Sequence, residues 1–200
     1  MTRLWLIAGM AVALATPAGA QTLSSWGRGS QLAVTGGVAH DGTDTRAVLG
    51  GAAAWELTTF FAVEGTGRWI DHRHHDAFAG ELSALIGLGG SRDTAVPYLA
   101  VGVGLHRRTF EVTPAALDGV PGFYRRRLGE PAALGVRRSF TDPTLVAGVG
   151  VDIALSRTVV VRPDVRTLFV VNGGRHATVM VASVSLGYRF ERKFVTPSRR

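Results

Sequence analysis

The stretch that decides the fold is residues 177–190, with the sequence ATVMVASVSLGYRF. After Thr178, one set of alternate residues is apolar or aromatic: Met180, Ala182, Val184, Leu186, Tyr188 and Phe190. The interleaved set is mostly small or polar: Val179, Val181, Ser183, Ser185, Gly187 and Arg189. A period of two predicts a β-strand with one apolar face and one mixed face. The aromatic pair at its end lies where an interfacial girdle is expected on a strand that crosses a bilayer.

The first twenty residues have the organisation of a secretory signal peptide. Arg3 provides a positive charge, residues 4–15 form an apolar core, and Ala18-Gly19-Ala20 is an A-x-A cleavage pattern. We therefore predict a signal peptide over residues 1–20, a β-barrel domain over 21–190 and a basic tail over 191–200. The chain has no cysteine, which excludes a lipoprotein anchor, a disulfide framework and a thiolate metal site.

Composition limits how the exported chain could meet a membrane. After Gln21 no apolar run approaches the roughly 20 residues that a membrane-spanning helix needs. A chain that spans a bilayer without such helices must form a closed barrel, because lipid offers no partners to backbone polar groups. The net charge of +7, from 22 Lys and Arg against 15 Asp and Glu, favours anionic lipid headgroups. With an export signal, we expect no nucleic-acid partner.

Seven further segments show the same alternation: residues 31–39, 46–57, 60–71, 77–88, 98–108, 144–155 and 158–170. The eight segments are about 9 to 14 residues long, which suits tilted membrane strands. Pro163 lies in one of them and removes a ladder donor. Their connections alternate between short turns and longer loops, the longest being residues 109–141. That arrangement is typical of outer-membrane barrels and predicts that the termini and short turns are periplasmic.

The mixed faces indicate a lumen rather than a water-facing surface. Their charges are few and nearly balanced, whereas exposed surfaces usually have dense Lys and Glu. The predicted lumen charge network is Arg46, Glu56, Glu64, Arg68, Glu81, Asp152, Arg162, Asp164, Arg166 and Arg189. Large aromatics near strand ends predict a girdle that includes Trp55, Trp69, Tyr188 and Phe190. The alternative is a soluble, lipocalin-like exported barrel with an apolar interior.

Four stretches support a resemblance to a known family: residues 97–105 (PYLAVGVGL), 147–152 (AGVGVD), 162–166 (RPDVR) and 187–190 (GYRF). On these residues the chain resembles the small eight-stranded outer-membrane β-barrel family, which is OmpA/OmpX-like and porin-like. The resemblance implies an all-β, antiparallel up-and-down transmembrane barrel with short periplasmic turns and one long extracellular loop. It also implies recognition by the barrel-assembly machinery, although residues 191–200 follow the terminal aromatic where the family's assembly signal usually ends.

An eight-stranded barrel is just wide enough for side chains to fill its interior. Buried charges are costly unless they pair, so the ten inward charges predict a closed, ion-paired plug. We therefore expect a monomeric outer-membrane protein with a structural or surface-interaction role and no enzymatic activity, cofactor or bound metal. The alternative is a narrow gated path, that is, a small pore or transport-associated barrel.

The predicted loops contain the remaining candidates. Residues 109–141 contain Arg125, Arg126, Arg127, Arg137 and Arg138, a possible anion-binding loop for the phosphates of lipopolysaccharide. Residues 71–76 (DHRHHD) combine metal-binding residue types, but neighbours on a tight loop rarely converge on one ion, so we expect a solvated loop. Ser139 and His106 are the candidates for an alternative hydrolase that acts on lipid.

Overall fold

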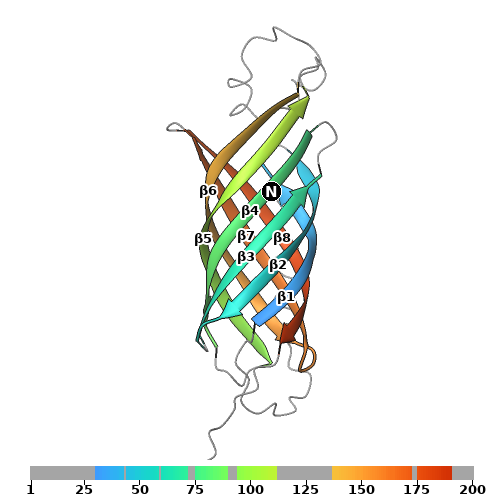
Figure 1. The fold of residues 1–200 in the computed structure, drawn as a ribbon, viewed down its shortest axis with the longest axis vertical. Coiled ribbons are helices and arrows are strands. Elements are labelled where there is room, and N and C mark those ends of the chain that lie inside the picture. Colours follow the sequence, from blue (N-terminus) through green and yellow to red (C-terminus); the bar gives the residue numbers. More distant parts are fainter. Residues whose placement is uncertain are drawn as a thin grey trace, which may run out of the picture.

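A computed structural model of the chain describes residues 30–42, 44–58, 60–71, 75–89, 94–111, 137–172 and 175–190. Within these ranges the chain forms eight β-strands (Figure 1). Their bounds are β1 Ser30–His40, β2 Thr45–Glu56, β3 Phe61–Ile70, β4 His75–Gly87, β5 Ala95–Glu111, β6 Arg137–Ala154, β7 Val159–Asn172 and β8 Arg175–Phe190. Each strand overlaps one of the eight alternating segments, so the predicted strand count is confirmed.

The strands form one closed antiparallel barrel in sequence order. Each strand pairs with its neighbours in the chain, and β8 pairs with β1 from Ser30↔Phe190 to His40↔Met180. Figure 1 shows the strands steeply tilted around a single axis. Closure gives every strand two neighbours, which is what a bilayer demands of a spanning sheet. The predicted up-and-down transmembrane topology is confirmed.

We call the end with Ser30 and Phe190 the terminal end, and the end with the β5–β6 connection the far end. The terminal-end connections are residues 57–60, 88–94 and 155–158, and those at the far end are 41–44, 71–74, 112–136 and 173–174. The expected contrast between short turns and longer loops therefore holds for one connection only. At the far end, most strands continue a residue or two beyond the alternating segments, which shortens the other connections there.

The long loop is also shorter than predicted, because β5 and β6 continue into it. The two strands pair without interruption from Ala95↔Ile153 to Glu111↔Arg137. Residues 109–111 and 137–141, which we had expected in the loop, therefore belong to a two-stranded extension. In Figure 1 this extension reaches the highest level of the far end. The β6–β7 ladder stops earlier, at Thr144↔Val170.

Pro163 interrupts the barrel wall as its chemistry predicts. Arg189 N–H donates to Thr158 O at 2.7 Å, so even-numbered residues of β7 bond to β8 and odd-numbered residues face β6. Pro163 has no N–H to offer on that side. The β6–β7 ladder runs to Gly150↔Asp164 and resumes at Ile153↔Val161, and between these pairs Val151 and Asp152 have no ladder partner in β7.

Several predictions lie outside the described residues: the signal peptide (1–20), the basic tail (191–200), His72 to His74, and Arg125 to Arg127. In the part of the chain that is described, no helix is long and apolar enough to cross a membrane. That finding concerns helices alone.

Candidate functional site

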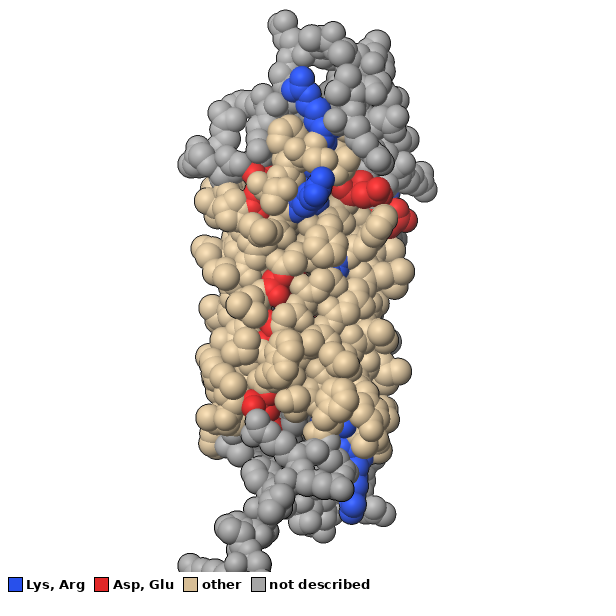
Figure 2. All heavy atoms as spheres, viewed as in Figure 1, with Lys and Arg blue, Asp and Glu red and all other residues tan. Residues whose placement is uncertain are grey.

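The barrel wall is apolar and the lumen is polar at mid-height. Large apolar side chains cover the outside of every strand, and many are more than half exposed, including Val34, Leu49, Leu82, Val101 and Leu186. Figure 2 shows one face of the molecule, on which the charged side chains gather mainly toward the two ends. Such a wall suits hydrocarbon, and the soluble lipocalin-like alternative, which needs the opposite polarity, is wrong.

Exposed aromatic side chains lie near both ends of this wall. Trp55, Tyr188 and Phe190 lie toward the terminal end, where Tyr188 and Phe190 meet edge to face with ring centroids 5.3 Å apart. Trp69 and Phe78 are cross-strand partners toward the far end. The four residues predicted for the girdle are thus all on the outer face, and they divide between the two levels at which a bilayer interface would lie.

At mid-height the lumen contains a central charge network of three arginines and four carboxylates. Arg166 donates to Glu64 at 2.5 Å, to Asp164 at 3.0 Å and to Glu81 at 3.4 Å. Arg68 pairs with Glu81, and Arg162 pairs with Glu64 and, at 2.5 Å, with Asp152. All seven side chains are almost completely buried. Each arginine therefore meets at least one carboxylate in a space without bulk water, where such contacts are strong but costly to break.

Neutral side chains complete this network. Glu64 accepts a hydrogen bond from Thr66 at 3.2 Å, and Asp164 accepts bonds from Ser183 and, at 3.4 Å, from Tyr98. The Arg162 guanidinium lies over the Tyr98 ring, 5.2 Å from its centroid. Tyr98 was not among the predicted site residues, although it is in phase with the inward-facing Ala100 and His106. The prediction of the lumen network considered charged side chains alone.

Glycines make room for these large side chains. Gly50, Gly148 and Gly150 lie directly opposite Arg68, Arg166 and Tyr98 on neighbouring strands. A Cβ at Gly148 would lie 2.8 Å from Arg166 Cγ, and other positions show the same crowding. The high glycine content of the strands therefore has a packing role in the lumen. Each of these large inward side chains faces an empty position across the ladder.

The lumen is not polar throughout, contrary to the prediction of a purely polar plug. On the far-end side of the central charge network lies an apolar layer of buried side chains: Ala39, Val48, Ile70, Ala77, Ala79, Val146, Leu168, Val170, Val179 and Val181. Ala62, Leu85, Tyr98 and Ala100 form a smaller apolar cluster. Strands such as β7 are apolar on both faces near the far end, so alternation gave no sign of inward packing there. The lumen is thus filled by two chemically different layers.

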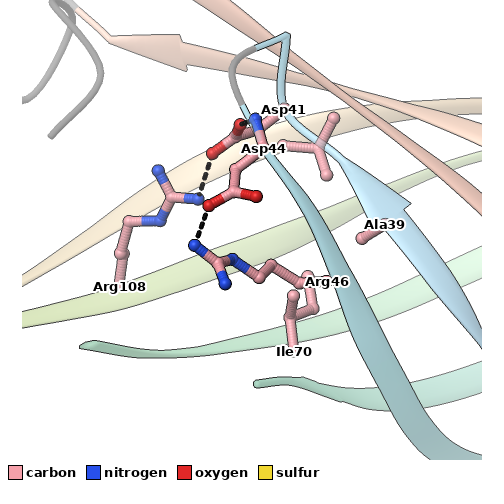
Figure 3. A pocket seen from close by; sticks show the side chains of 7 residues that line it. Ala39, Asp41, Asp44, Arg46, Ile70 and Arg108 are labelled. Carbon is pink, nitrogen blue, oxygen red and sulfur yellow. Dashed lines mark hydrogen bonds and ion pairs between the residues drawn. The ribbon is translucent and has the colours of Figure 1, made fainter. Parts of the chain in front are cut away.

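A second set of ion pairs lies at the far-end rim (Figure 3). The β1–β2 turn, in which Gly42 has a φ of 90°, presents Asp41 and Asp44. Asp41 accepts from Arg108 at 2.8 Å, and Asp44 pairs with Arg46. Ala39, Ile70 and Val179 form the base of the shallow pocket between them. Both pairs are satisfied within the chain, so they hold the turn against the barrel.

The structure separates the ten predicted lumen charges into groups. Seven make up the central charge network. Glu56 and Arg189 are buried near the terminal end, whereas Arg46 is partly exposed at the rim and pairs with Asp44. Arg108 and Asp142 also face inward but were not among the predicted lumen charges, because both flank the predicted loop.

The hydrolase alternative loses its proposed pair of residues. His106 is buried inside the barrel opposite Asp142, whereas Ser139 is exposed and hydrogen-bonds with Thr109 at 2.9 Å. The two candidates thus lie in different environments, with the serine outside the buried lumen. Among the described residues, no group of three or more His, Cys, Asp or Glu side chains is placed to hold a metal ion. The histidines at positions 72–74 are outside that search.

This arrangement, with an apolar wall, aromatic rows near both ends and a buried ion-paired lumen, defines a transmembrane β-barrel. No protein family and no curated protein matches the sequence. Among solved structures, the N-terminal β-barrel domain of Pseudomonas aeruginosa OprF is similar, with 10% identity and a TM-score of 0.58 over 80% of this chain and 97% of that one. Neisserial surface protein A is 14% identical, with a TM-score of 0.55 over 80% and 96% of the two chains.

The outer membrane protein OprG from Pseudomonas aeruginosa is also similar, at 15% identity and a TM-score of 0.51, over 84% of this chain and 99% of that one. At such identities the likeness establishes the fold alone. The chain has the fold of the small eight-stranded outer-membrane barrels, and the expected resemblance is confirmed at that level.

Proposed function

We propose that the protein is an exported outer-membrane barrel with a structural or surface-interaction role and a lumen closed to solutes. The proposal depends chiefly on one observation, the inverted polarity of a wall with exposed Leu, Val and Trp around buried arginine–carboxylate pairs. A predicted signal peptide over residues 1–20 supports export. The outer membrane is where barrels of this size and fold are found among the similar structures.

Closure is supported by the two layers in the lumen. The central charge network spans several strands, and the apolar layer packs side chains of less than 5% exposure above it. A hydrated ion would have to displace both, and an eight-stranded barrel has little room beyond its own side chains. We therefore favour the closed barrel over the small-pore alternative.

Cell fractionation and a gel-mobility shift on heating would test the membrane assignment, and planar bilayers would test closure. We expect the folded, purified protein to give no steady conductance. Leu168→Ala removes side-chain volume from the apolar layer only, and Arg166→Ala removes it from the charge network only. Neither single variant should therefore conduct, whereas the double variant should. Steady current through the wild-type barrel would favour the small pore instead. A processed chain that is soluble and folded without detergent would refute the membrane assignment.

We further propose that the far-end arginines bind lipopolysaccharide phosphates. Arg138 is exposed on the β5–β6 extension, at the base of the connection that contains Arg125, Arg126 and Arg127. Guanidinium groups bind phosphate in a bidentate manner. Replacement of the three loop arginines by Ser should abolish binding to lipopolysaccharide vesicles, and unchanged binding would rule the contact out.

A further inference from the structure

The apolar layer of the lumen reaches the far-end mouth of the barrel at the shallow rim pocket. Ala39, Ile70 and Val179 belong to that layer and also form the base of the pocket. All three are less than 5% exposed, although they lie near the end of the barrel. The side chains that border the pocket beyond this base are the charged residues of the rim (Figure 3).

One of the two rim ion pairs crosses the mouth. Arg108 lies on β5, whereas Asp41 follows β1, and three strands separate β1 from β5 in either direction around the closed sheet. The two residues therefore come from opposite walls. On its own side of the barrel, Arg108 has the uncharged cross-strand partners Ala77 and Phe140. Its guanidinium meets the Asp41 carboxylate at 2.8 Å, with the two side chains only 3% and 11% exposed.

Asp41 uses its two carboxylate oxygens for different contacts. Oδ1 accepts a hydrogen bond from the Asp44 N–H at 3.1 Å, within the turn, and Oδ2 accepts one from Arg108. The Asp41 N–H also donates to Asp44 O at 3.2 Å, so the turn has hydrogen bonds of its own. Phe110 lies beside Arg108, whose Cζ is 5.9 Å from the ring centroid. A preformed turn thus meets a guanidinium that an aromatic ring helps to position.

The other rim pair has the same chemistry but a different span. Asp44 accepts from the Thr45 N–H at 2.9 Å, and its carboxylate pairs with Arg46. Arg46 is two residues away in the same hairpin, and both side chains are partly exposed, at 25% for Arg46 and 47% for Asp44. This pair connects the hairpin to itself, so it does not cross the mouth.

We propose that the β1–β2 turn is a strap across the far-end mouth, which the Asp41–Arg108 pair fastens to the opposite wall. The fastened strap keeps small molecules away from the outer end of the apolar layer, and release of the pair admits small apolar molecules to it. The inference rests on the outer-membrane barrel proposed above, in which the far end faces outward. The charge network and the apolar layer prevent passage through the lumen, whereas the strap controls entry at its outer end.

Thiol labelling of the full mature chain in lipid nanodiscs tests the strap. The chain has no cysteine, so Val179→Cys places a single thiol at the base of the pocket. Asp41→Asn keeps an oxygen for the Asp44 N–H but loses the charge that holds Arg108. Val179→Cys alone should react slowly with a water-soluble maleimide, and about tenfold or more faster when combined with Asp41→Asn. The matched control Asp44→Asn should change the rate by less than about twofold.

Two further measurements separate release of the strap from general loosening. Val181 lies deeper in the apolar layer and outside the pocket, so Val181→Cys should react slowly with or without Asp41→Asn. Loss of the Asp41 charge makes the mouth more positive, so an anionic thiosulfonate reagent should gain more in rate at Val179→Cys than a cationic one. Arg108→Gln breaks the same pair from the other wall and replaces Asp41→Asn if that variant loses the heat-dependent mobility shift of the folded barrel.

Equal labelling of Val179→Cys in the Asp41→Asn and Asp44→Asn backgrounds would refute the strap, and so would fast labelling without either change. Fast labelling of Val181→Cys in the Asp41→Asn background would also overturn it, because the whole far end would then have loosened. Failure of the strap is distinguishable from failure of the closed lumen. Labelling that depends on Asp41, together with steady current through the wild-type barrel, would support the strap and refute the closed lumen; labelling independent of Asp41, without current, would do the reverse.

Discussion

Replacement of Arg166 by Met should destabilise the barrel more than the same replacement of any other arginine in the lumen or at the rim. Arg166 is buried and touches three carboxylates: Glu64, Asp164 and Glu81. Met has a similar reach but no charge, so the central charge network would keep four carboxylates against two guanidinium groups. Removing one partner from a buried ion network costs about 3–5 kcal/mol. The equilibrium between folded and unfolded barrel should shift by roughly a hundredfold to a few thousandfold.

The matched control is Arg107→Met. Arg107 is exposed on the outer side of the far end, so its loss should cost less than about 1 kcal/mol in the free energy of unfolding. Both variants would be unfolded in denaturant from detergent micelles, with tryptophan fluorescence and gel mobility as readouts. A difference of no more than about 1 kcal/mol between the free energies of unfolding of the two variants would mean that water reaches the lumen charges, and it would refute the closed barrel.

A double-mutant cycle would separate the pairwise contribution from general disruption. Glu64→Gln keeps the shape of the side chain and removes one of the four negative charges. Residues of one buried network typically couple by about 0.5–3 kcal/mol, so the cost of the Arg166→Met, Glu64→Gln pair should fall below the sum of the single costs. If the destabilisation of the double variant equals the sum of the two single values, the 2.5 Å contact between Arg166 and Glu64 contributes little to stability.

Three further predictions concern packing, the rim and the bilayer. Gly150→Ala should cost about 1–3 kcal/mol in the free energy of unfolding, because its Cβ would collide with the Tyr98 hydroxyl. Gly65→Ala, with open space at its Cβ, should be nearly neutral. Equal destabilisation of the two variants in thermal unfolding would contradict this packing argument. Asp44→Asn should change stability by less than about 1 kcal/mol, and less still at high salt, because its pair with Arg46 is partly exposed; a large, salt-independent loss in denaturant titrations would count against this. Trp55 and Trp69 should each be quenched most by spin-labelled lipids with the label near the headgroups, since both are exposed near strand ends; maximal quenching by labels at the bilayer centre would disprove the girdle.

Alternation was sufficient to locate all eight strands and to identify which face meets lipid. In β3, for example, Glu64 and Arg68 alternate with Val63 and Trp69, and the two sets lie on opposite sides of the wall. The signal was strong because the two environments differ so much in polarity. It weakened toward the far end, where Leu168 and Val170 face inward and Phe169 faces outward, although all three are apolar.

The pairing of charges could not be predicted from the sequence. Arg166 and Glu64 are 102 residues apart in the chain, and only the closure and stagger of the barrel bring them together. Arg46 belonged to the correct face but lies at the rim, because its height depends on that same stagger. The extension of β5 and β6 was missed for a local reason: Arg107, Arg108 and Asp142 resemble loop residues, yet Arg108 and Asp142 are buried.

The opposition of glycines and large inward side chains has a consequence for how such a sequence can change over generations. A large side chain can replace one of these glycines only if the arginine across the ladder becomes small at the same time. Arg68 and Gly50, or Arg166 and Gly148, should therefore be inherited and replaced as couples. Substitution at only one position of a couple would be selected against. Related barrels should therefore preserve the combined side-chain volume of each couple better than they preserve either residue type.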